Sequence, residues 1–92
     1  MKEEIKTQVL ARLKSIEGHV RGVYRMVEED VYCIDIIKQT LAVQSAIAKV
    51  NTLILESHLE TCVTTAIKGD DLGERERVID ELLDVFEMSQ KL

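Results

Sequence analysis

The chain has 92 residues, of which 46% are hydrophobic, and a formal net charge of −5 at pH 7. This length predicts a single domain, 1–92, that buries only a modest core by itself. No apolar run approaches the about 20 residues that span a bilayer, which excludes a membrane-spanning helix. Two cysteines without a signal peptide are typical of a protein in the reducing cytoplasm rather than of a secreted disulfide scaffold.

The overall negative charge hides a basic N-terminal region. Residues 1–25 carry six basic and three acidic groups, whereas the rest of the chain carries six basic and fourteen acidic ones. An acidic protein with this distribution can still present a basic face to DNA. Charge alone makes Lys14, Arg21 and Arg25 candidates for that face, although each by itself is more commonly a solvated residue on a helix.

The first predicted element is a helix over about residues 4–29. Its apolar residues recur at alternating spacings of four and three along the chain: Val9, Leu13, Ile16, Val20, Val23 and Val27. This heptad pattern indicates an amphipathic helix. Gly18 and Gly22 lie on one face of it and favour close approach, either of another helix or of a DNA backbone.

The second predicted element is an unusually long helix, about 31–67, with Asp30 as its N-cap. It is apolar over a broad arc, so we expect its own helices and a second subunit to cover it together. Gly69, Asp70, Asp71 and Gly73 predict a short loop. A third amphipathic helix follows over about 74–90. The sequence therefore predicts an all-α, three-helix protomer.

Three side chains form a candidate metal-ligand set: Cys33, His58 and Cys62. His58 and Cys62 are four residues apart on one helical face. Cys33 and Cys62 are separated by 29 positions, or about 43 Å along a continuous helix. One chain cannot join them, so the set predicts a symmetric antiparallel homodimer with two identical shared sites.

Two thiolates and one imidazole suit Cu(I), whereas a structural zinc ion would need a fourth ligand. The same approach of two chains permits a redox disulfide between Cys33 and Cys62 of the other chain, and this alternative stays open. The sequence contains no phosphate-binding loop, no Ser/His/Asp set and no H-E-x-x-H pattern. We therefore expect a sensor and not an enzyme.

The segments RLKSIEG, YCIDI and HLETC resemble the CsoR/RcnR family of small helical bacterial repressors, over about residues 9–67 and more loosely in the last helix. The resemblance implies an antiparallel four-helix-bundle homodimer, a dimer of dimers and DNA binding without a helix-turn-helix. The Cys33, His58, Cys62 pattern is similar to the copper(I)-sensing branch, and nickel- or cobalt-sensing relatives have His in place of Cys62.

The resemblance also implies roles for four further residues. Tyr32 and Glu81 match residues that surround the bound His in the copper branch, where a metal-bound imidazole needs a partner for its second nitrogen. Arg12 and Lys49 match DNA-contact positions, although relatives often have Arg where Lys49 stands, and Lys loses the bidentate phosphate contact.

These features lead to a principal hypothesis, which is a cytoplasmic, copper(I)-responsive repressor that releases operator DNA when the metal binds. A cysteine-based persulfide or redox sensor on the same scaffold is the alternative. A helical interaction module that does not bind DNA is a third possibility.

Overall fold

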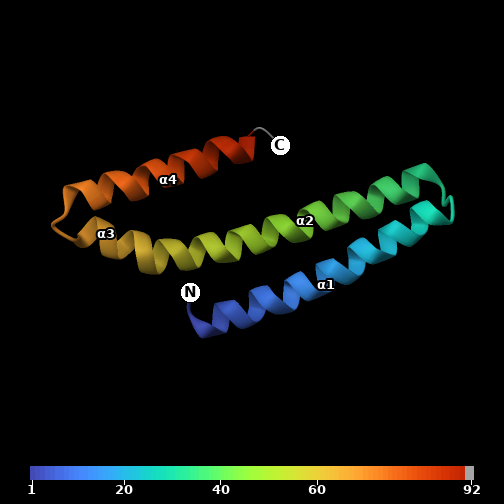
Figure 1. Cartoon of the computed structure of the whole chain (residues 1–92), viewed down its shortest axis with the longest axis horizontal. Helices are drawn as coiled ribbons and strands as arrows, with labels where there is room; N and C mark the ends of the chain where they lie inside the picture. Colours follow the sequence, from blue (N-terminus) through green and yellow to red (C-terminus); the bar gives the residue numbers. More distant parts are fainter. Residues whose placement is uncertain (91–92) are drawn as a thin grey trace. The chain divides into compact units, whose positions relative to one another are not determined.

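The computed structural model describes residues 1–90, and this part of the chain is helical with no strand. Its segments, seen in Figure 1, are α1 (Glu3–Glu28), α2 (Cys33–His58), the π-helical segment η1 (Leu59–Val63), α3 (Thr64–Lys68) and α4 (Leu72–Gln90). The predicted all-α fold is confirmed. The chain divides into two compact units, Met1–Ser57 and His58–Leu92.

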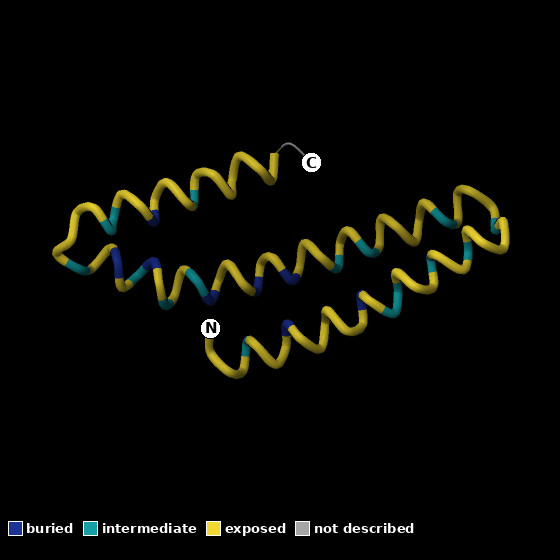
Figure 2. The backbone as a smooth tube through the Cα atoms, viewed as in Figure 1, coloured by how far each residue is buried: buried dark blue, intermediate teal, exposed yellow. Residues whose placement is uncertain are grey.

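The first unit is an antiparallel hairpin of α1 and α2, which lie side by side in Figure 1. Val9 and Ile16 of α1 pack against Val50 and Leu53 of α2, and these four side chains form its buried core. Figure 2 shows the buried positions on the sides of the two helices that face each other. The rest of the predicted heptad pattern is less buried, since Leu13, Val20 and Val27 remain exposed on α1.

The turn between α1 and α2 is a helix C-terminal motif rather than an N-cap. Asp30 has a positive φ of 52°, and its N–H donates to the Val27 carbonyl. The Val31 N–H donates to the Met26 carbonyl, which completes a Schellman motif. The prediction that Asp30 starts the second helix was therefore wrong. The motif extends through Val31, so α2 begins at Cys33.

The predicted long helix is also interrupted. The chain stays helical from Cys33 to Lys68, but Leu59–Val63 is π-helical. The Thr64 hydroxyl donates to the Leu59 carbonyl five residues earlier, which satisfies an acceptor inside this wider turn. Apolar periodicity indicates which side chains are buried but does not distinguish backbone hydrogen bonds to the fourth residue from those to the fifth, so the sequence did not predict this segment.

The second unit joins η1 and α3 to α4 through a short link. Val63 and Ala66 pack against Val78 of α4, and Leu82 lies against this cluster. Asp71 accepts a hydrogen bond from the Glu74 N–H, so it caps α4, which begins at Leu72, two residues before the predicted start. The described helices include none that is long and apolar enough to cross a membrane.

Candidate metal centre and nucleic-acid interface

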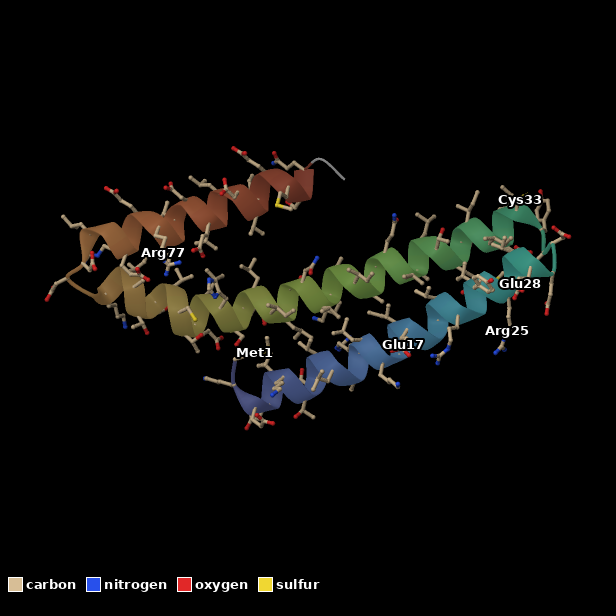
Figure 3. The ribbon with its side chains drawn as sticks, in the orientation of Figure 1. Met1, Glu17, Arg25, Glu28, Cys33 and Arg77 are labelled. Atoms are coloured by element: carbon tan, nitrogen blue, oxygen red, sulfur yellow. The ribbon has the colours of Figure 1, made fainter. Side chains whose placement is uncertain are left out.

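Cys33 is the first residue of α2 and carries an exposed free thiol, labelled in Figure 3. The carbonyl of Tyr32 accepts the first hydrogen bonds of this helix, from Asp35 and Ile36. Tyr32 is therefore the N-cap residue, and its side chain is 69% exposed.

The other two candidate ligands lie at the opposite end of α2. His58 is the last residue of α2 and is half-buried, whereas Cys62 lies inside η1 with an exposed thiol. The Thr61 hydroxyl lies 3.6 Å from the Cys62 sulfur and donates to it. Single π-helical turns recur at functional sites because they reposition side chains relative to a regular α-helix.

A single chain does not assemble the full ligand set. Residues 1–90 contain no group of three His, Cys, Asp or Glu side chains placed to hold one metal ion. The 26 residues of α2 extend over about 39 Å, with Cys33 at the first and His58 at the last. The structure thus brings His58 and Cys62 to one segment and leaves Cys33 at the far end of the helix.

The helical periodicity of α2 places the residues at its two ends on one face of the helix. Cys33 and His58 are separated by 25 positions, which turns them about 20° apart around the helix axis. Thr40, Ile47 and Ile54 continue the row from Cys33 at intervals of seven residues, and both isoleucines are exposed. One face of α2 therefore carries Cys33 at its beginning, the half-buried His58 at its end and two exposed isoleucines between them.

Glu81 lies on α4 and is exposed. Arg77, labelled in Figure 3, donates to the carboxylates of both Glu74 and Glu81. The hydrogen bond from Arg77 lowers the pKa of Glu74, and the same pairing raises the pKa of Arg77. Within one chain, Glu81 is therefore an acceptor for Arg77. A role beside His58 requires Glu81 to share or exchange this partner.

A shallow open hollow of about 610 Å³ adjoins Cys62 in the second unit. It is bounded by the end of η1, by α3 and by the first turns of α4, with Asp70, Asp71, Glu74 and Arg77 on its polar side. The acidic groups outnumber the one arginine, so this hollow disfavours anions. Cys62 is one of the residues that line this hollow, and its thiol is exposed.

The candidate DNA-contact residues occupy two sides of α1. Lys14, Arg21 and Arg25 lie within an arc of about 40°, on the side turned away from Val9 and Ile16. In Figure 3 the Arg25 side chain extends away from α2. Glu17 pairs with Lys14 at 3.8 Å and with Arg21 at 2.8 Å, which offsets part of this charge.

Arg12 lies on a different side of α1, about 160° from the row of Lys14, Arg21 and Arg25. It is next to the face that carries the buried residues Val9 and Ile16. Arg12 and Lys49 are both exposed, and neither forms an ion pair within residues 1–90. The hairpin core pairs Val9 with the region of Val50, so Arg12 and Lys49 occupy the same part of the hairpin.

The sequence did not predict one polar link between α1 and α2. His19 Nε2 lies 2.8 Å from Gln39 Oε1, which joins the two helices near the turn. The sequence signal was present, since a polar residue on each helix stands next to the apolar strip. Only the register of the hairpin shows that these two side chains meet.

The family model described as metal-sensitive transcriptional repressor matches residues 5–88 of the chain. The copper-sensing transcriptional repressor CsoR of Bacillus subtilis is 50% identical over 86 residues, which are 94% of this chain and 82% of that protein. The copper-sensing repressor CsoR of Mycobacterium tuberculosis H37Rv is 41% identical over 87 residues, covering 95% of this chain and 71% of the relative.

Two solved structures are also similar. The copper-sensing repressor CsoR with Cu(I) from Geobacillus thermodenitrificans gives a TM-score of 0.86 at 41% identity, covering 98% of this chain and 91% of that one. The nickel-responsive transcriptional regulator InrS gives a TM-score of 0.75 at 36% identity, covering 87% of this chain and 90% of that one.

The packed helices, with a free cysteine at the first residue of α2 and His58 and a second free cysteine near its other end, are typical of the class of metal-sensing repressors that the family model describes. The chain belongs to the family of metal-sensitive transcriptional repressors, the CsoR/RcnR family.

Proposed function

We propose that this protein is a copper(I)-responsive repressor in the cytoplasm, which binds operator DNA and releases it when Cu(I) binds. Cys33 of one chain would hold the metal together with His58 and Cys62 of a second chain. The observation that carries this proposal is the α2 face that has Cys33 at one end and His58 at the other.

Two antiparallel copies of that face would place each Cys33 beside the other copy's His58. Ile47 and Ile54 remain exposed on this face, and they suit the interface of a four-helix-bundle homodimer. Each dimer would contain two identical sites, and two dimers would associate as a dimer of dimers. The protomer would act as one domain over residues 1–92.

The donor set fits Cu(I). Both cysteines are free and exposed, so two sulfur donors are available in addition to the His58 imidazole. Three soft or borderline donors match Cu(I), whereas a structural zinc ion would need a fourth ligand. Tyr32, beside Cys33, and Glu81, on α4, would orient the His58 imidazole through its second nitrogen.

The bound state would hold the α2 helices of two chains in one relative position. DNA affinity would then fall because the basic surfaces of the hairpins are held in an arrangement that matches the duplex poorly. Coupling of this kind is typically about 1–3 kcal/mol, and DNA must weaken Cu(I) binding by the same factor.

Arg12 and Lys49 would make the principal phosphate contacts, because they lie in the same part of the hairpin and are free of ion pairs within residues 1–90. Lys14, Arg21 and Arg25 would act mainly through their charge, since they occupy the far side of α1. Arg12→Ala and Lys49→Ala should each reduce the salt dependence of DNA binding by about one unit of slope. Arg25→Ala is the matched control, with a smaller expected change.

Mixing two single variants tests the shared site. Cys33→Ala and Cys62→Ala proteins should each lose Cu(I)-triggered DNA release. After subunit exchange, heterodimers should contain one intact site and one site without either cysteine. X-ray absorption should then show two sulfurs and one nitrogen at the copper. Absence of any recovered site, with exchange verified by mass, would contradict the proposal.

The exposed free thiols also favour a second candidate, a cysteine-based persulfide or redox sensor. His58→Ala separates the two functions, because thiol chemistry needs only Cys33 and Cys62. Release of DNA by polysulfide but not by Cu(I) in the parent protein would select this alternative. Release by Ni(II) alone would instead select a nickel response, as described for InrS.

A further inference from the structure

The polar link between α1 and α2 lies on the same edge of the hairpin as the proposed DNA contacts. His19 follows Arg12 by seven residues, so the two side chains are about 20° apart around α1. On α2, the edge that carries Gln39 continues at spacings of three and four through Ala42 and Ala46 to Lys49. The His19–Gln39 hydrogen bond shows that these two edges meet.

The register gives the spacing of this surface. Arg12 lies seven residues before His19, which is about 10 Å along α1, and Lys49 lies ten residues after Gln39, which is about 15 Å along α2. Because the helices are antiparallel, both displacements run in the same direction from the His19–Gln39 pair. Arg12 and Lys49 are thus offset from each other by about 5 Å along the hairpin. The His19–Gln39 pair therefore lies on the same surface of the hairpin as Arg12 and Lys49, at a separate point along its length.

We propose that His19, positioned by Gln39, is a third DNA-contact residue, whose Nδ1–H donates to a phosphate oxygen beyond the segment bound by Arg12 and Lys49. This inference rests on the proposed DNA-binding function. Nδ1 makes no hydrogen bond within residues 1–90, and the His19–Gln39 bond lies at an exposed position. The ring is half-buried against the hairpin and is therefore held in place on a surface open to DNA.

Gln39 allows a neutral imidazole to donate. A side-chain amide offers an acceptor oxygen and a donor nitrogen in the same shape. With Gln39 Oε1 as acceptor, His19 Nε2 carries the proton and Nδ1 cannot donate. With the amide rotated by half a turn, the Gln39 amide N–H donates to Nε2, and Nδ1 carries the proton instead. Since phosphate oxygens only accept, bound DNA selects the second arrangement without a change in charge.

The experiment measures operator DNA affinity of the reduced, metal-free protein at several salt concentrations, with melting temperature and oligomer mass recorded for each variant. His19→Ala and Gln39→Ala should each weaken binding about tenfold, the value of one hydrogen bond to a charged acceptor. The salt slope should not change, because a neutral donor releases no counterion. His19→Gln, which keeps an N–H donor, should recover most of the affinity.

Gln44→Ala is the matched control, since it removes an amide from the same helix about 140° away from Gln39. It should bind DNA like the parent. Parent-like affinity in His19→Ala would overturn the inference, as would a loss that His19→Gln does not recover. If His19→Ala reduced the salt dependence of DNA binding by about one unit of slope, the inference that a neutral imidazole is the donor would be overturned. These outcomes concern His19 alone, whereas a parent protein that does not bind DNA, or does not release it with Cu(I), contradicts the proposed function.

Discussion

The two compact units of the chain differ in charge and in the parts of the sensor that they contain. Met1–Ser57 has eight basic and eight acidic side chains, whereas His58–Leu92 has four basic and nine acidic ones. The first unit contains the proposed DNA contacts and Cys33, and the second contains His58, Cys62 and Glu81. Neither unit carries a complete metal-ligand set, so the proposed copper site would link the first unit of one chain to the second unit of another.

His58→Ala should give the largest effect and tests this division directly. It removes one of three ligands, and loss of even a residue that only supports a ligand typically costs about 10–100-fold in metal affinity. DNA binding by the metal-free protein should stay unchanged, because the contacts lie in the other unit. Competition with a Cu(I) chelator and DNA titration measure the two properties separately. If His58→Ala lost both Cu(I) binding and DNA binding, the two functions would not be divided between the two units.

Leu53→Ala should destabilise the first unit by about 2–5 kcal/mol, because it removes a large side chain from a small core. Leu83→Ala on α4 is the control, since that side chain is 56% exposed. Chemical denaturation followed by circular dichroism gives both values. A Leu53→Ala protein as stable as the control would contradict the packing of the α1–α2 hairpin.

Asp30→Gly should stabilise the hairpin by about 0.5–1 kcal/mol. Asp30 occupies the left-handed region at φ 52°, where glycine has no side-chain penalty. The gain is limited because glycine also makes the unfolded chain more flexible. Asp30→Ala should be destabilising by comparison. Equal stability of the glycine and alanine variants would exclude the left-handed turn.

The smallest effect concerns the acidic second unit. The Arg77 hydrogen bond lowers the pKa of Glu74, so the folded pKa lies below the unfolded value. The contribution of this pair is present above the ordinary glutamate pKa and is lost as pH falls through the lowered folded pKa. Carboxyl NMR titration should therefore give a higher Glu74 pKa in Arg77→Met than in the parent. Identical titration curves would exclude the ion pair in solution.

The predicted boundaries failed where backbone geometry competes with side-chain pattern. Asp30 was expected to start a helix because aspartate is a good N-cap, but the same short polar side chain tolerates the left-handed conformation that ends α1. The π-helical turn at Leu59–Val63 is defined by backbone hydrogen bonds to the fifth residue, which the pattern of apolar side chains did not predict. The first helix and the start of α4 came within two residues of prediction because their polar ends are clearly marked.

The sequence by itself determined the all-helical fold, the family and the candidate donor set, because helical periodicity and ligand chemistry depend on residue types at local spacings. Only the tertiary structure decided which surfaces these residues share. It placed Arg12 of α1 and Lys49 of α2 in the same part of the hairpin, and it paired His19 with Gln39 across twenty positions of the chain. These arrangements depend on the register of α1 against α2, which is set by how Val9 and Ile16 pack in one core with Val50 and Leu53.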